Sequence, residues 1–141
     1  MSADFNPEET ARFSEDLIAD PPGMSSEEQA AIDALPEGNA LLIVTRGPNL
    51  GARFLLDADS TIAGRHPNAD IFLDDVTVSR KHVEFKRSNG VFEIVDLGSL
   101  NGTYMLGQRV DRATLENGSD VQIGKFKMIF YSAPNSREDS Q

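Results

Sequence analysis

The sequence of 141 residues contains no cysteine and no tryptophan, and it has only 13 basic residues against 23 acidic ones. Without cysteine, neither a disulfide framework nor thiolate chemistry is available, which agrees with a reducing cytoplasm. No apolar stretch approaches the roughly 18 residues of a transmembrane helix, and the first residues lack the basic and apolar segments of a signal peptide. The net charge of −10 argues against binding to nucleic acid. We therefore expect a cytoplasmic protein that binds neither membranes nor nucleic acid.

The negative charge is concentrated near the N-terminus. Residues 1–38 hold ten acidic residues and one arginine, whereas residues 39–141 hold thirteen acidic and twelve basic ones. Residues 1–38 are also poor in β-branched and aromatic residues, so we expect a disordered acidic arm that is either solvated or orders on binding. Two short helix signals lie within it, at 8–19 and 25–35, and Ser25 with Glu28 matches a capping box. The polar residues 134–141 predict a frayed tail.

Short β-type segments separated by turn signals fill residues 39–133. Asn89-Gly90 is the strongest hairpin signal, because a type I′ turn needs positive φ at both central positions. Phe126, Met128 and Phe130 share one face of an expected strand, and Lys127, Ile129 and Tyr131 lie on the other face. The expected strands are 41–46, 53–56, 61–64, 71–73, 81–87, 91–96, 103–106, 109–110, 114–115, 121–123 and 126–131. This pattern predicts a single all-β domain, an antiparallel sandwich or barrel.

Cationic, hydroxyl and amide side chains follow three of these strands. Arg65 can grip phosphate oxygens with two parallel hydrogen bonds, and Ser79 offers a hydroxyl donor beside the positive charges of Arg80 and Lys81. Asn101 can both donate and accept, which suits the backbone of a bound peptide. No nucleophile–base pair, metal-ligand cluster or Walker motif accompanies them. We expect a phosphate-binding site in a protein that is not an enzyme and that uses no cofactor or metal.

Each of these residues also has an ordinary structural interpretation. Arg65 by itself is more often a surface ion pair, with Asp70 or Asp74 as partner, and Ser79 is a common turn residue. Asn101-Gly102 could be a tight turn only, and His82 a histidine that bridges loops. The prediction of a site depends on the whole set and its order.

The set resembles the forkhead-associated (FHA) domain. The resemblance spans about residues 40–131 and is carried by Gly64-Arg65, by Ser79-Arg80-Lys81-His82 and by Ser99-Leu100-Asn101-Gly102-Thr103-Tyr104. It implies an eleven-stranded β-sandwich that binds phosphothreonine peptides through its loops. By position, Arg65 and Ser79 would contact the phosphate, with Arg80 beside it. Leu100 and Asn101 would contact the peptide backbone, while Gly64, His82 and Gly102 would hold the loops in shape.

The layout of acidic arm, single FHA domain and short tail is similar to that of a group of small actinobacterial FHA regulators. This resemblance implies a monomeric inhibitor of the E1 component of 2-oxoglutarate dehydrogenase, with glutamate dehydrogenase and glutamate synthase as further partners in some members. It also implies that a serine/threonine kinase phosphorylates a threonine in the arm, that the domain then binds its own phosphothreonine, and that the partners are released.

The arm departs from that group at one position. Those regulators carry Glu-Thr-Thr-Ser-Val-Phe, whereas this chain has Glu8-Glu9-Thr10-Ala11-Arg12-Phe13, so Thr10 is the expected acceptor and Glu9 replaces the other threonine. Thr10 lies 29 residues before Asn39, a distance that a flexible linker spans at about 30 Å. Capture of phospho-Thr10 within one molecule is therefore feasible. The alternative is a general adaptor that binds phosphothreonine peptides of kinases or other proteins in trans.

Overall fold

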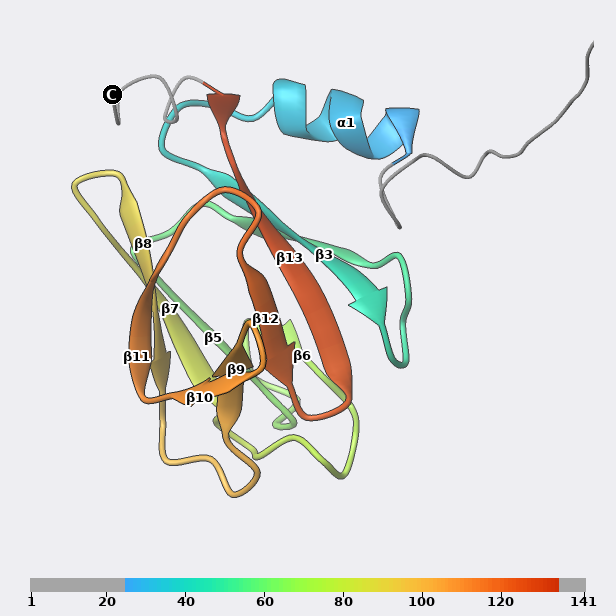
Figure 1. The fold of residues 1–141 in the computed structure, drawn as a ribbon, viewed down its shortest axis with the longest axis vertical. Helices are drawn as coiled ribbons and strands as arrows, with labels where there is room; N and C mark the ends of the chain where they lie inside the picture. The colour runs from blue at the N-terminus through green and yellow to red at the C-terminus, as the bar shows by residue number, and fades with distance from the viewer. Residues whose placement is uncertain (1–24, 135–141) are drawn as a thin grey trace, which may run out of the picture.

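The computed structural model describes residues 25–134, which form one helix and two β-sheets with eleven strands in all (Figure 1). The six-stranded sheet has the order β10 (Gln108–Val110), β9 (Thr103–Met105), β12 (Asp120–Ile123), β13 (Phe126–Ser132), β3 (Ala40–Arg46), β4 (Arg53–Leu56). The five-stranded sheet has the order β11 (Arg112–Leu115), β8 (Val91–Asp96), β7 (Val83–Ser88), β5 (Ser60–Gly64), β6 (Ile71–Phe72). The expected eleven-stranded sandwich is confirmed.

Neighbouring strands are antiparallel, with one exception. The two-residue strand β6 pairs parallel to β5, with Ala63 opposite Ile71 and Gly64 opposite Phe72. Residues 65–70 form a loop that brings the chain back beside the end of β5. The chain then continues in the same direction as β5, which makes β6 parallel to it. This arrangement places the loop that carries Arg65 at the end of β5.

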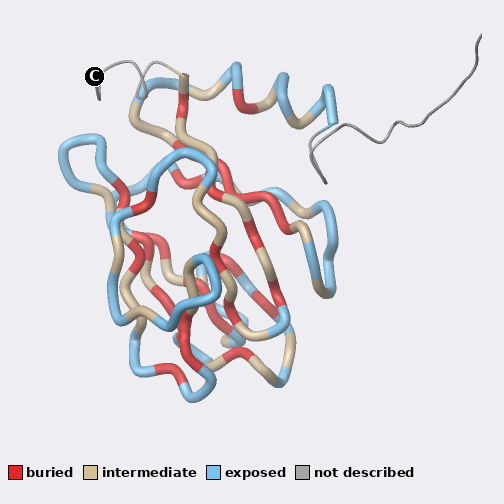
Figure 2. Tube along the Cα trace, in the orientation of Figure 1, coloured by how far each residue is buried: buried red, intermediate tan, exposed pale blue. Residues whose placement is uncertain are grey.

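The main core lies between the two sheets. Alternate residues of β7, β8, β12 and β13 are buried in this core, and Phe85, Phe126 and Phe130 are among the largest side chains that are fully buried. Figure 2 shows buried segments along the facing strands and exposed ones in most connecting loops. The rings of Phe92 and Phe130 meet edge to face across the sheets, with centroids 5.4 Å apart. The inward face predicted for Phe126, Met128 and Phe130 is confirmed.

The predicted hairpin turn between β7 and β8 is also confirmed. Asn89 and Gly90 adopt φ values of 55° and 78°, which are the two positive values that a type I′ turn requires. Such a turn matches the right-handed twist of its strands, so this hairpin is specified by local sequence.

Helix α1 (Ser26–Asp33) lies within the stretch that we expected to be a disordered arm. The predicted capping box is present: the Ser25 hydroxyl accepts from the Glu28 amide at 3.1 Å, and the Glu28 carboxylate accepts from the Ser25 amide at 2.9 Å. Ile32 packs on Leu41 and Ile43, which project from the outer face of the six-stranded sheet. An eight-residue helix is marginal alone, and this apolar contact explains why it is ordered.

The two ends of the sandwich differ. Helix α1 covers β3 near one end, and the loops that follow β5, β6 and β8 gather at the other end (Figure 1). Among residues 25–134, no helix has the length and apolar character needed to cross a membrane. The expected helix at 8–19, the acceptor Thr10 and all of the tail except Pro134 lie outside the described residues.

Candidate functional site

Three loops are joined by hydrogen bonds into one surface. The loop from Thr77 to Lys81 lies in the middle. On one side, the amides of Arg65 and His66 donate to the carbonyls of Ser79 and Arg80, at 2.9 and 3.2 Å. On the other side, the Leu100 amide donates to the Ser79 hydroxyl oxygen at 3.0 Å. The structure therefore brings together the residues that the sequence places in separate segments.

Arg65 is exposed, and its side chain is oriented by one bond. Its Nε donates to the Val78 carbonyl at 3.0 Å, which fixes the plane of the guanidinium while the two terminal nitrogens keep their four N–H donors. Among the described residues Arg65 makes no ion pair, so the alternative of a surface pair with Asp70 or Asp74 does not apply. This geometry suits two-pronged binding of a phosphate.

Ser79 and Asn101 are held in a similar manner. Because the Ser79 oxygen accepts from the Leu100 amide, its own hydroxyl proton remains free to be donated to a ligand. Asn101 donates one side-chain N–H to the Thr77 carbonyl at 2.9 Å, which leaves its carbonyl oxygen and its second N–H for a peptide backbone. Arg80 and Leu100 are exposed beside them, and the side chain of Leu100 is 86% exposed.

Gly64 is needed for close approach, not for a turn. A Cβ at this position would lie 2.0 Å from the Arg80 carbonyl oxygen and 3.0 Å from that of Ser79. Any side chain would therefore push the middle loop off the end of β5. Gly102 differs, because its φ of +86° is a conformation that favours glycine.

His82 connects the middle loop with the loop after β8. It is completely buried, its Nδ1 accepts from the Ser79 amide at 3.0 Å, and its Nε2 lies 2.8 Å from the Gly102 carbonyl. These partners place the ring proton on Nε2. Burial lowers the pKa of His82, against the opposing effects of the Gly102 carbonyl and the Asp96 charge. A neutral His82 thus positions Ser79 and Gly102 together.

Asp96 organises the loop that carries Leu100 and Asn101. Its carboxylate accepts from the hydroxyls of Ser99 and Thr103, at 2.5 and 2.7 Å, and from the amides of Gly98 and Ser99 at 3.0 Å each. Burial alone would raise the pKa of Asp96, but these hydrogen bonds outweigh it and the pKa lies below its usual value. Ser99 in turn accepts from the Gly102 amide at 3.0 Å.

Thr77 is a structural centre of the site that the sequence analysis missed. Its amide and hydroxyl both donate to Asp75, and its hydroxyl oxygen accepts from the Lys125 amide at 2.9 Å. The bonds from Thr77 hold the pKa of Asp75 below its usual value. The spacing Asp-x-Thr, which is typical of an Asx turn, was the available signal. Thr77 thereby ties the middle loop to the turn between β12 and β13.

Arg109 was missed as well, and no local signal pointed to it. It lies on β10, and its guanidinium packs against Gly102, where an added Cβ would come within 2.8 Å of its Nε. The side chain is exposed and adds a positive charge next to Asn101.

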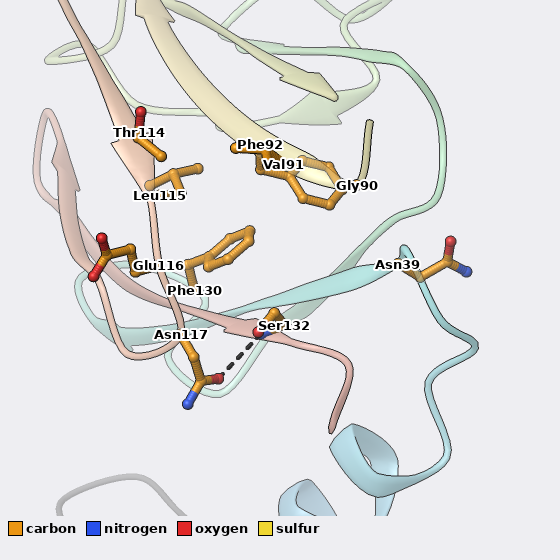
Figure 3. Close-up of a pocket in the computed structure, with 10 residues that line it drawn as sticks. All are labelled: Asn39, Gly90, Val91, Phe92, Thr114, Leu115, Glu116, Asn117, Phe130 and Ser132. Atoms are coloured by element: carbon orange, nitrogen blue, oxygen red, sulfur yellow. Dashed lines mark hydrogen bonds between the residues drawn. The ribbon is translucent and has the colours of Figure 1, made fainter. Parts of the chain in front are cut away.

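A cavity of about 570 Å³ lies at the other end of the sandwich. Figure 3 shows Phe92, Leu115 and Phe130 gathered in it, with the Asn117 side chain accepting from the Ser132 amide. No arginine or lysine lines this cavity, and Glu116 adds a negative charge, so it does not suit a phosphate. Within residues 25–134, no three metal-ligating side chains come together.

Comparison with known proteins identifies the family. The model of the FHA domain matches residues 61–124. The glycogen accumulation regulator GarA of Mycolicibacterium smegmatis is 52% identical over 140 residues, which cover 96% of this chain and 89% of that protein. This chain belongs to the FHA-domain family. The oxoglutarate dehydrogenase inhibitor of Corynebacterium jeikeium is also 52% identical, over 87% of each protein. These relatives are named as regulators and inhibitors. Like them, this chain has an FHA domain, which is a binding module and not a catalytic fold.

Solved FHA structures share the fold. A domain studied for phosphothreonine-dependent FHA interactions has a TM-score of 0.63 and 29% identity, and the match covers 68% of this chain and 98% of that one. EmbR of Mycobacterium tuberculosis, solved in complex with a low-affinity phosphopeptide, also has a TM-score of 0.63 and 29% identity, over 67% of this chain and 24% of that chain.

Proposed function

We propose that this FHA protein inhibits 2-oxoglutarate dehydrogenase while it is unphosphorylated, and that binding of its own phospho-Thr10 ends the inhibition. The observation that supports this most is the near full-length similarity to proteins named oxoglutarate dehydrogenase inhibitors, which extends beyond the FHA domain itself. The E1 component is the proposed target, with glutamate dehydrogenase and glutamate synthase as further partners. The protein acts as a cytoplasmic monomer, in the compartment of these metabolic enzymes.

The arrangement of donors supports phosphothreonine as the ligand. Arg65 presents its terminal nitrogens and Ser79 its hydroxyl proton, while Asn101 keeps its carbonyl oxygen and second N–H for a peptide backbone. A phosphate carries a charge of about −1.5 to −2, and each charge-assisted hydrogen bond contributes roughly 1.5–3 kcal/mol. Two or three such bonds are sufficient for about micromolar affinity.

Helix α1 shortens the connection between Thr10 and the domain. Because α1 packs on β3 and its N-cap is Ser25, Thr10 lies 15 residues before the docked part of the chain, not the 29 counted back from Asn39. Fifteen residues reach at most about 50 Å. A domain of this size has a radius of gyration of about 13 Å, hence a diameter of about 35 Å. Phospho-Thr10 can therefore reach the loops at the far end while α1 stays docked.

Tethering makes the self-binding effective. A short linker gives an effective concentration on the order of millimolar, so even a weak phosphopeptide is mostly bound within its own molecule. The same surface cannot hold the arm and a partner at once. Phosphorylation by a serine/threonine kinase then acts through competition.

The test is an assay of 2-oxoglutarate dehydrogenase with added full-length protein. We expect inhibition by the unphosphorylated protein and release after phosphorylation of Thr10, with Thr10→Val remaining inhibitory after kinase treatment. Arg65→Ala should remain inhibitory after phosphorylation if its own binding to the enzyme is retained, because it cannot capture the phosphate. Absence of inhibition by the unphosphorylated protein would contradict the proposal.

A second candidate is an adaptor that binds phosphopeptides of other proteins. The specific support is EmbR, an FHA protein that was solved with a phosphopeptide bound. This candidate predicts that the partner must be phosphorylated, whereas the inhibitor needs no phosphate on the enzyme. Treating the partner with a phosphatase before a pull-down separates the two.

A further inference from the structure

A second cavity lies directly beside the phosphate-binding residues. It has a volume of about 350 Å³ and is lined by His66, Arg80 and Lys81 together with Ile62, Asn68, Ala69 and Asp70. His66 follows Arg65 in the chain, and Arg80 and Lys81 follow Ser79. The residues that line the cavity are therefore one or two positions along the chain from Arg65 and Ser79, which are proposed to hold the phosphothreonine.

Positive charges outnumber negative ones in the lining of this cavity. Arg80 and Lys81 are exposed, and neither makes an ion pair with any of the described residues. The His66 Nδ1 accepts from the Asn68 amide at 3.0 Å, which places the ring proton on Nε2 as an additional donor. Asp70 is the only carboxylate in the lining, and one of its oxygens accepts from the Ile62 amide at 2.9 Å. The cavity thus offers two cations and one further N–H donor against one partly engaged anion.

The sequence around Thr10 contains a matching ligand. Glu8 and Glu9 precede Thr10, whereas Ala11 and Arg12 follow it. In an extended peptide each residue advances about 3.3–3.6 Å, so both carboxylates lie within reach of a cavity that adjoins the phosphate. Arg12 would be repelled there, which favours the N-terminal side of the peptide over the C-terminal side.

We propose that the cavity formed by His66, Arg80 and Lys81 is a carboxylate subsite, which binds the acidic residues Glu8 and Glu9 next to the phosphothreonine. Lys81 is its specificity-determining residue, since it has no other partner among the described residues. The inference rests on the proposed binding of phospho-Thr10. It also gives a role to Glu9, which adds a charged contact where a second threonine would offer a second acceptor.

The test uses the full-length chain with Thr10→Val, so that its own arm cannot be phosphorylated and the loops are free. The probe is a synthetic peptide of residues 4–18 with phosphothreonine at position 10, compared with the same peptide carrying Glu8→Gln and Glu9→Gln. Affinities are measured by fluorescence anisotropy at low and at high ionic strength. Lys81→Ala removes the proposed contact, and Lys86→Ala on β7 is the matched control for the loss of one exposed lysine.

We expect Lys81→Ala to weaken binding of the native phosphopeptide about threefold at low ionic strength, which lies within the range measured for exposed ion pairs. It should change the affinity of the Gln peptide little, and Lys86→Ala should change neither. The difference should shrink at high ionic strength. Equal losses on both peptides, or an equal effect of Lys86→Ala, would overturn the subsite.

Two further variants distinguish a failure of the carboxylate subsite from a failure of the proposed phosphothreonine binding. Arg109→Ala tests the other cation beside the site, and coupling of Arg109 in place of Lys81 to Glu8 and Glu9 would also overturn the subsite. Arg65→Ala tests the phosphate site itself. If Arg65→Ala binds normally, or if the unphosphorylated peptide binds equally well, the proposed function fails, whatever Lys81→Ala does.

Discussion

Replacement of Gly64 by alanine should disturb the binding loops through one steric contact. The added Cβ would lie 2.0 Å from the Arg80 carbonyl oxygen, which is closer than any real contact. The backbone at Gly64 is not in the left-handed region, so alanine has no conformational penalty there. The whole effect must come from displacement of the middle loop.

The magnitude follows from the contacts that the displacement affects. Overpacking costs typically 1–3 kcal/mol. The bonds from the amides of Arg65 and His66 to the carbonyls of Ser79 and Arg80 would be weakened, at about 1 kcal/mol each. A total loss of about 2–5 kcal/mol corresponds to a decrease in Tm of roughly 8–20 °C for a protein of this size.

Calorimetry and phosphopeptide titration on the same samples would check this prediction. Gly51→Ala is the control, because Gly51 has φ of +89° with nothing within 4 Å of its added Cβ. We expect Gly51→Ala to cost about 1 kcal/mol in backbone strain and to keep the affinity. If Gly64→Ala melted and bound as the parent does, the steric argument would be refuted.

Three other predictions concern His82, Ser99 and Ile32. Because burial lowers the pKa of His82, the unfolded state takes up a proton below about pH 6.5 that the folded state resists, so stability should fall as the pH decreases through this range. Urea unfolding at several pH values should show this slope in the parent and a flatter one in His82→Gln, and an unchanged slope in the variant would contradict the assignment. Ser99→Ala removes a donor to Asp96 and the acceptor of the buried Gly102 amide, so we expect a loss of about 1–3 kcal/mol and a pKa of Asp96 closer to its usual value, measured by carboxyl NMR titration. An Asp96 titration identical to that of the parent would count against this network. Ile32→Ala should undock α1 from β3 while the sandwich stays folded, so hydrogen exchange should accelerate in α1 alone; protection that persists in α1 would show that Ile32 is not its anchor.

Residues that are neighbours in the sequence determined a strand face, a turn and a helix start. The alternation of Phe126, Met128 and Phe130 specifies a strand with one buried face, and Asn89-Gly90 specifies the turn between β7 and β8. Ser25 and Glu28 specify the start of α1. The binding residues were also visible in the sequence, which carries them in a recognisable order: Gly64-Arg65, then Ser79 to His82, then Asn101-Gly102. The roles assigned to them remain predictions until binding is measured.

Only the tertiary structure decided what depends on contacts between distant residues. Helix α1 is ordered because Leu41 and Ile43 on β3 offer an apolar outer surface, and no pattern within residues 25–35 contains that information. Arg109 reaches Gly102 because β10 pairs with β9, and Thr77 meets Lys125 across the end of the sandwich. The reason is physical: turns, caps and alternation are set by neighbours in the chain, whereas packing and the convergence of loops are set by the sheets that bring distant residues together.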